Sequence, residues 1–244
     1  MKNLGELLMV GVEGTVVTSE TSRFIKDTNC GGVILFKRNY ENPKQLKKFV
    51  EDLNNEARKP LIVAVDQEGG RVARFSEPFT HIPPMAEVGR SAKKNPQVVF
   101  ELGRVLGLEL SACGINLDFA PVMDVATNPQ NPVIGDRAFS SDANEVARLG
   151  AEFIKGIQSQ GVAACAKHFP GHGDTKDDSH FALPVLDHEL ARLRKCEFIP
   201  FISAIKNQVA SIMTAHILLP NIDPDSPATI SHTIINNLLR KELG

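Results

Sequence analysis

Short apolar runs alternate with longer amphipathic segments along the whole chain, and this alternation limits the folds that the chain can adopt. The apolar runs, each suited to one buried strand, fall at residues 7–12, 33–36, 61–65, 115–119, 161–166 and 209–213. Apolar residues at helical spacing, together with helix-capping residues, mark the segments that follow them. A strand–helix–strand order makes neighbouring strands parallel and joins them by right-handed crossovers. We therefore expect an α/β fold, either a doubly wound sheet or a (β/α) barrel.

The polar residues that follow these runs favour the barrel. Several of the predicted strands end in ionisable side chains, namely Asp66, Asp118, Asp124, Lys167, His168 and His216. A ring of such side chains is typical of the C-terminal mouth of a TIM barrel, where the active site lies. The first predicted strand is not followed by the G-x-G-x-x-G pattern of a dinucleotide fold. The 244 residues therefore predict a single TIM-type (β/α)8 barrel domain, of which the chain carries about six βα units.

Proline positions predict where the regular elements are interrupted. We expect a loop over residues 76–92, because this segment contains three prolines. Residues 120–139 form a second loop, which is long enough to suggest a functional role. The helical segment that begins at Asp187 contains Pro200, which predicts a kink or two short helices. Ser231 is suited to cap the last helix.

Composition excludes several classes of partner. Lys and Arg number 27 against 29 Asp and Glu, so the net charge is −2 and no basic surface for nucleic acid is indicated. No apolar run is long enough to span a membrane, and the first residues lack the pattern of a secretory signal. The 4 cysteines form no C-x-x-C pair, which is typical of reduced core thiols. We expect a cytoplasmic protein without a nucleic-acid or membrane partner.

The stretch CAKHFPGHGDTKDDSH at residues 165–180 concentrates polar groups at the end of the fifth predicted strand. A metal site is one interpretation, since histidine and aspartate are common metal ligands. Pro170 and Gly171 separate His168 from His172, however, so these two rings cannot share a helix face as in H-E-x-x-H. We expect neither a metal nor another cofactor.

Acid–base chemistry is the second interpretation of this stretch. Asp178 and His180 lie two positions apart, close enough for the carboxylate to accept the Nδ1 proton and leave Nε2 to protonate a leaving oxygen. Directional hydrogen bonds to the hydroxyl groups of a sugar would come from Asp66, Arg137, Lys167 and His168. A phosphate site would instead need a glycine-rich loop at a helix N-terminus. The pattern favours a neutral, polyhydroxylated ligand.

Motifs spread over nearly the whole chain resemble glycoside hydrolase family 3, and more narrowly its bacterial β-N-acetylhexosaminidase branch. They are ILFKRN (34–39), VDQEGGRVARF (65–75), LDFAPVMDV (117–125), IGDRAF (134–139), KHFPGHGDTKDDSH (167–180), MTAHI (213–217) and PATIS (227–231). The runs KHFPGHGDT and DQEGGR are the most specific. The DSH run at 178–180 argues for the hexosaminidase branch, because relatives that act on plain glucosides are expected to take their acid from elsewhere.

The resemblance implies roles for individual residues. It implies that the N-acetylglucosamine ring is held by Asp66, Arg74, Arg137, Lys167 and His168. It also implies that His180 protonates the glycosidic oxygen and that Asp178 orients this histidine, in agreement with the acid–base interpretation.

One residue that the resemblance implies has no counterpart in this sequence. Members of the family hydrolyse with retention through a covalent glycosyl-enzyme, and their nucleophile is an aspartate at the end of strand seven. Retaining hydrolysis needs this second carboxylate. The sequence ends at Gly244, after the helix that follows the sixth predicted strand. We therefore expect residues 1–244 to be the N-terminal catalytic barrel domain of a longer enzyme, truncated before strand seven.

The resemblance thus predicts a retaining exo-β-N-acetylglucosaminidase. Its expected substrates are muropeptide-type glycosides of the cell wall in a cytoplasmic recycling route, and its expected full-length form is a monomer. Two alternatives remain open. One is β-glucosidase or phosphorolytic activity on the same fold, and the other is a catalytically inactive sugar-binding fragment.

Overall fold

The computed structural model of the protein describes residues 4–176 and 182–244. Its strands form one parallel sheet in the order β1-β2-β3-β4-β5-β6, so each strand pairs with the next one along the chain. The strands are β1 (Met9–Gly11), β2 (Gly32–Leu35), β3 (Ile62–Val65), β4 (Leu117–Asp118), β5 (Ala163–Phe169) and β6 (Ser211–Thr214). The strand order never reverses, as it would at the switch point of a doubly wound sheet. The barrel-type prediction, with six βα units, is therefore confirmed.

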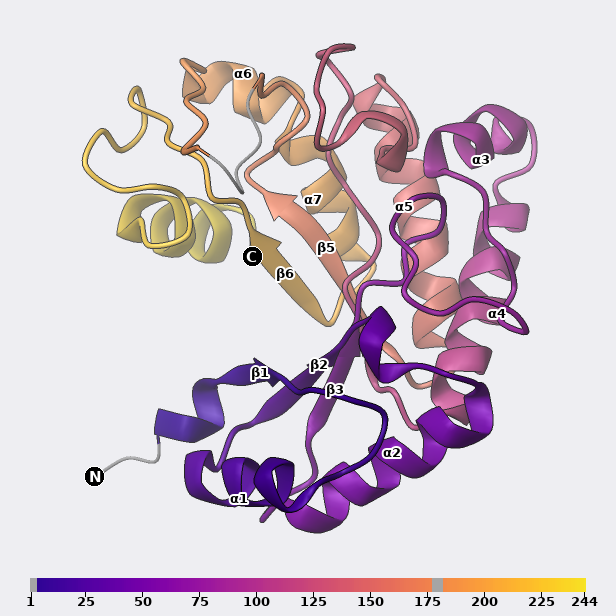
Figure 1. Ribbon diagram of the computed structural model, residues 1–244. Helices are drawn as coiled ribbons and strands as arrows, with labels where there is room; N and C mark the ends of the chain where they lie inside the picture. The colour runs from indigo at the N-terminus through magenta and orange to yellow at the C-terminus, as the bar shows by residue number, and fades with distance from the viewer. Residues whose placement is uncertain (1–3, 177–181) are drawn as a thin grey trace.

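The sheet curls, and the helices lie on its outer side (Figure 1). The helices are α1 (Ser19–Thr28), α2 (Pro43–Glu56), α3 (Met85–Ala92), α4 (Gln97–Ala112), α5 (Ala143–Gln158), α6 (Leu190–Lys195), α7 (Phe198–Lys206) and a C-terminal π-helix (Thr233–Glu242). Helices α1 and α2 lie outside β1–β3, and α7 packs against α5 and β5. The strands therefore form part of the wall of a TIM-type barrel, with their C-terminal ends on one face.

Local sequence signals explain where the helices begin. The Asn42 side chain accepts a hydrogen bond from the Gln45 backbone N–H at the start of α2, and the Gln45 side chain accepts one from Glu41 N–H. Asp142 caps α5 in the same way, through the N–H groups of its second and third following residues. The Asn42 and Asp142 side chains thus satisfy backbone donors that each helix itself leaves unpaired.

Close packing of α4 against α5 holds the middle of the domain together. A Cβ atom on Gly156 of α5 would lie 2.2 Å from the Phe100 carbonyl oxygen of α4, so a larger residue cannot be accommodated there. Leu106 and Leu110 of α4 and Phe153 of α5 are fully buried in the same core. Helix α5 of this pair also packs against β5, a strand that leads into the site.

The structure corrects three sequence-based expectations. The expected loop 76–92 contains α3, because Pro84 precedes the helix and does not interrupt it, and Met85, Val88 and Ala92 are buried at helical spacing. The first strand is shorter than expected, since Leu4–Leu7 forms a 3₁₀ turn. Strand β5 continues to Phe169 because its last residues pair with β6. Lys167 and His168 therefore lie within the strand and not after it.

The helical segment after Asp187 consists of two short helices, which is one of the two forms that the sequence predicts. The break falls at Cys196–Glu197, and Pro200 lies in the first turn of α7, where no backbone N–H is needed. The Ser231 side chain accepts a hydrogen bond from Ile234 N–H, as expected for a cap on the last helix. No helix in residues 4–176 and 182–244 is long and apolar enough to cross a membrane.

Candidate active site

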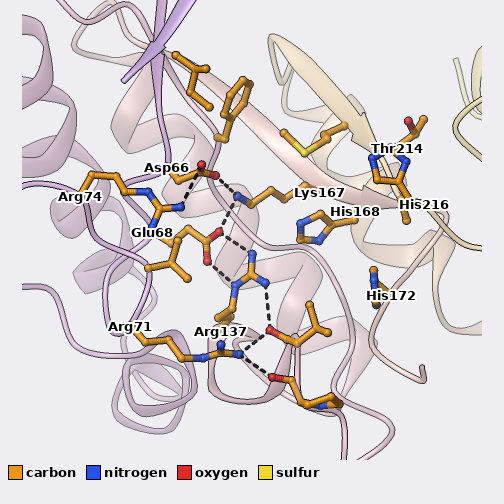
Figure 2. Close-up of a pocket in the computed structure, with 17 residues that line it drawn as sticks. Asp66, Glu68, Arg71, Arg74, Arg137, Lys167, His168, His172, Thr214 and His216 are labelled. Atoms are coloured by element: carbon orange, nitrogen blue, oxygen red, sulfur yellow. Dashed lines mark hydrogen bonds and ion pairs between the residues drawn. The ribbon is translucent and has the colours of Figure 1, made fainter. Parts of the chain in front are cut away.

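A cavity of about 550 Å³ opens at the C-terminal ends of the strands. The residues that the sequence predicts for sugar binding all line it, namely Asp66, Arg74, Arg137, Lys167 and His168. Figure 2 shows how they converge from β5 and from the loops after β3 and β4. The fold thus brings Lys167 into contact with Asp66, 101 positions away in the sequence.

Lys167 lies at the centre of the charged cluster (Figure 2). Its side chain is only 2% exposed, and its Nζ lies 2.9 Å from Asp66 Oδ1 and 2.6 Å from Glu68 Oε1. Burial alone would lower the pKa of Lys167, but Glu68 and Asp66 outweigh burial, so the pKa is raised. The ammonium group is therefore charged although it is buried.

Glu68 binds Arg137 through a two-pronged ion pair. Arg137 Nε donates to Glu68 Oε2 at 2.8 Å and Nη2 donates to Oε1 at 2.7 Å. Arg137 Nη1 donates to the Val133 carbonyl oxygen at 3.0 Å. Burial would raise the pKa of Glu68, but Lys167 and Arg137 hold it at about 2. The same contacts raise the pKa of Arg137 against the opposing effect of burial.

Asp66 and Arg74 form the more open side of the cluster. The Arg74 guanidinium lies 3.4 Å from Asp66 Oδ2 and faces the Phe36 ring at 5.9 Å. The Asp66 side chain is 18% exposed, whereas Glu68 is 3% exposed. Asp66 is thus the carboxylate of this pair that is more accessible to a ligand.

His168 is oriented by a buried carboxylate on the other side of the cavity. Its Nδ1 lies 2.7 Å from Asp124 Oδ2, and Asp124 also accepts the backbone N–H groups of His168 and His172. Burial lowers the pKa of His168 although Asp124 raises it, so the ring is neutral at pH 7. Burial would raise the pKa of Asp124, but His168 and the hydrogen bonds lower it. Because Nδ1–H donates to the carboxylate, Nε2 is left as an acceptor.

Glu68 was missed in the sequence, and no partner was assigned to Asp124. Glu68 lies in the DQEGG run beside Asp66, and that neighbourhood was its only signal. Asp124 was recognised as a residue after a strand, but its partner His168 is 44 positions away. Local spacing does not predict the contacts of Glu68 or the contact of Asp124 with His168. The curl of the sheet brings these residues together.

Two other residues noted at strand ends have different surroundings. Asp118 is fully buried and accepts a hydrogen bond from Gln67 N–H, and burial raises its pKa well above its usual range. Asp118 lies outside the cavity lining. His216 lines the cavity, and its Nδ1 lies 2.7 Å from Thr229 Oγ1. That hydroxyl donates to the Ala215 carbonyl oxygen, so it accepts from His216 Nδ1–H.

The predicted catalytic pair, Asp178 and His180, lies outside the described residues. The chain that leads toward it is well anchored: Asp174 accepts a hydrogen bond from Thr127, and Thr175 Oγ1 lies 2.8 Å from His172 Nδ1. In the part of the chain that the structure describes, no group of three or more His, Cys, Asp or Glu side chains is placed to hold a metal ion.

Comparison with known proteins gives consistent results. The family model described as "Glycosyl hydrolase family 3 N terminal domain" matches residues 1–244. A beta-hexosaminidase from Nitrosomonas eutropha is 40% identical over 241 residues, which cover 97% of this chain and 69% of the relative. A beta-hexosaminidase from Thiobacillus denitrificans is also 40% identical, with 97% of this chain and 67% of the relative covered.

Solved structures agree with the sequence comparison. The glycoside hydrolase family 3 beta-N-acetylglucosaminidase from Paenibacillus sp. superposes with a TM-score of 0.95 at 43% identity, covering 99% of this chain and 47% of that one. NagZ from Neisseria gonorrhoeae, solved in complex with N-trifluoroacetyl-D-glucosamine, gives a TM-score of 0.92 at 38% identity, covering 97% of this chain and 71% of that one. The chain thus spans between 47% and 71% of the length of these relatives. On the family match and these identities, the chain belongs to glycosyl hydrolase family 3 and carries its N-terminal domain.

Proposed function

We propose that the protein is a β-N-acetylglucosaminidase that removes terminal N-acetylglucosamine, and that the cavity at the strand ends is its sugar site. The observation that carries this proposal is the buried cluster of Asp66, Glu68, Arg137 and Lys167, in which each cation contacts a carboxylate before any ligand arrives. Such a cluster offers many directional hydrogen bonds and little net charge, which suits a neutral sugar. The similarity to beta-hexosaminidases supports the same conclusion.

Each predicted binding residue has a group available for the sugar. Asp66 offers a carboxylate oxygen at the open side of the cluster, and Arg74 offers donors beside it. Lys167 and Arg137 offer the N–H groups that Glu68, Asp66 and Val133 do not engage. His168 offers Nε2 as an acceptor. Donors and acceptors thus line the same cavity, as recognition of vicinal hydroxyl groups requires.

The proposed reaction is hydrolysis with retention. His180 would protonate the glycosidic oxygen and Asp178 would hold its tautomer, and an aspartate beyond Gly244 would attack the anomeric carbon. Residues 1–244 would then be the N-terminal catalytic barrel domain of a longer, monomeric enzyme, truncated before strand seven. The proposed substrates are muropeptide-type glycosides in cytoplasmic cell-wall recycling. Neither a cofactor nor a nucleic-acid or membrane partner is part of this proposal.

Chromogenic substrates test the proposal directly. The protein expressed from its complete gene should release 4-nitrophenol from its β-N-acetylglucosaminide much faster than from its β-glucoside, and added phosphate should not be required. A preference for the glucoside would instead indicate a β-glucosidase, and a requirement for phosphate would indicate a phosphorylase. Binding of N-acetylglucosamine without turnover would indicate a sugar-binding protein.

Substitution of the proposed acid separates its role from folding. His180→Ala should reduce release of 4-nitrophenol by at least a hundredfold, because general acid catalysis contributes about 10²–10⁴ in rate. His232→Ala, at an exposed histidine just before the last helix, should leave the rate unchanged. Equal rates for wild type and His180→Ala would contradict the assignment of His180.

A further inference from the structure

Glu68 touches both buried cations of the cavity but is itself almost inaccessible. Its side chain is 3% exposed, and both of its oxygens are engaged. Oε1 contacts Lys167 Nζ at 2.6 Å and Arg137 Nη2 at 2.7 Å, and Oε2 accepts from Arg137 Nε at 2.8 Å. Figure 2 shows Glu68 between these two side chains. A residue in this position acts on a ligand through its neighbours.

A count of the N–H donors of Lys167 and Arg137 shows which of them remain available to a ligand. Lys167 has three N–H groups, and within the described residues one contacts Glu68 and one contacts Asp66. Arg137 has five N–H groups, of which two donate to Glu68 and one donates to Val133. The tetrahedral and planar geometries of these groups fix the direction of the remaining hydrogens once the engaged ones are held. The contacts of Glu68 therefore set where the remaining donors point.

The balance of charge among the cavity side chains also depends on Glu68. Asp66 and Glu68 balance the two most buried cations, Lys167 and Arg137, whose side chains are 2% and 11% exposed. Arg74 adds a third positive charge on the more exposed side, against Asp66. Removal of the Glu68 charge would leave an uncompensated buried positive charge, which attracts anions strongly where water is excluded.

We propose that Glu68 is a positioning residue of this cavity: it directs the free N–H groups of Lys167 and Arg137 toward the sugar and it balances their charge, so that the site accepts a neutral sugar and rejects an anion. This inference rests on the proposed sugar site. It assigns to Glu68 a role in selectivity that a purely structural ion pair would not have.

The test compares three variants of the protein expressed from its complete gene. Glu68→Gln keeps the size of the side chain and removes its charge, whereas Glu68→Asp keeps the charge and shortens the reach. Glu197→Gln is the matched control, because Glu197 is also buried and its Oε1 lies 2.8 Å from Arg192, but it does not line the cavity. Each variant is titrated calorimetrically with N-acetylglucosamine and, separately, with inorganic phosphate, and its melting temperature is measured.

Glu68→Gln should bind N-acetylglucosamine at least tenfold more weakly than wild type and bind phosphate at least tenfold more tightly. Glu68→Asp should lose at least threefold in sugar affinity and gain none for phosphate. Glu197→Gln should match wild type for both ligands, even if it melts at a lower temperature. Loss of stability alone cannot produce the gain of phosphate affinity.

The results also separate this inference from the proposed function. If wild type binds the sugar and Glu68→Gln binds both ligands as wild type does, the role of Glu68 is overturned while the sugar site stands. If wild type does not bind the sugar, the proposed function fails, and the gain or lack of phosphate binding in Glu68→Gln still decides the charge-balancing role. If Glu68→Gln does not fold, Glu68→Asp decides, and a wild-type sugar affinity in that variant overturns the inference.

Discussion

Asp124 Oδ2 lies 2.7 Å from His168 Nδ1, and the same fully buried carboxylate accepts the backbone N–H of His168 and of His172. One side chain after β4 therefore fixes both the ring and the backbone at the end of β5. A carboxylate with this many donors is held in its charged form, because each donor favours the anion. His168 is thus oriented in the cavity before a ligand binds.

Asp124→Asn should destabilise the protein and weaken the site together. In Asp124→Asn an N–H group would face donors that now meet a carboxylate oxygen, and losing hydrogen bonds to a buried charged group costs about 2–3 kcal/mol. Urea denaturation should show this loss in the free energy of unfolding, with a several-fold rise in KM for the N-acetylglucosaminide. Asp225→Asn, at an exposed aspartate, is the control and should change neither quantity. An unchanged free energy of unfolding in Asp124→Asn would show that the buried contacts contribute little.

The buried His168 should make stability depend on pH in the mildly acidic range. Burial lowers its pKa below the ordinary value of 6.5 despite the opposing effect of Asp124. Below pH 6.5 the unfolded chain therefore binds a proton at this position that the folded chain does not bind. The contribution to stability is complete above pH 6.5 and is lost as pH falls toward the lower, folded-state pKa.

Denaturant titrations between pH 7.5 and pH 5 measure this effect. Wild type should lose more unfolding free energy over this range than His168→Gln, which has no titrating ring at this position. His232→Gln, at an exposed histidine, should keep the wild-type slope. A slope in His168→Gln equal to that of wild type would assign the dependence to other groups.

Arg71 holds the loop that presents Arg137. Its Nη2 donates to the carbonyl oxygens of Pro132, Val133 and Ile134, and its Nε donates to Asp136 at 3.0 Å. Because the side chain is half exposed, Arg71→Gln should cost about 1 kcal/mol of stability or less. Its KM should nevertheless rise about fivefold, since Arg137 loses its fixed position.

Arg104→Gln provides the control for this prediction. It removes a comparable exposed ion pair, between Arg104 and Glu101, that lies on α4 and away from the cavity. Both variants should have similar melting temperatures, and only Arg71→Gln should show the raised KM. Equal KM values in the two variants would mean that the loop keeps its position without Arg71.

The open edges of the sheet lead to a prediction about the gene. In the described residues β1 pairs with β2 and β6 pairs with β5, and neither has a partner on its other side. Leu7, two residues before β1, and Phe24 of α1 are exposed apolar side chains, and unpaired strand edges are normally covered. We expect the gene to continue beyond the Gly244 codon into two further βα units, the first with an aspartate at its strand end. Sequencing decides this, and an immediate in-frame stop codon would contradict it.

The sequence alone determined the class of fold and identified five of the cavity residues, namely Asp66, Arg74, Arg137, Lys167 and His168. Each apolar run must be buried, and the alternation of strands and helices leaves few ways to do this, so the βα order follows from local pattern. The errors of the sequence-based prediction also concerned local structure. The prolines of 76–92 suggested a loop where α3 forms, because burial of Met85 and Val88 outweighs what the composition suggests.

Only the tertiary structure decided how the cavity residues act on one another. Lys167 and Asp66 are 101 positions apart, and His168 and Asp124 are 44 apart. No spacing rule connects them, because their contacts arise from the curvature of the sheet. The pairing of Glu68 with both buried cations is of the same kind. Sequence gives the chemical groups, whereas burial and long-range packing set their charge states and the directions of their hydrogen bonds.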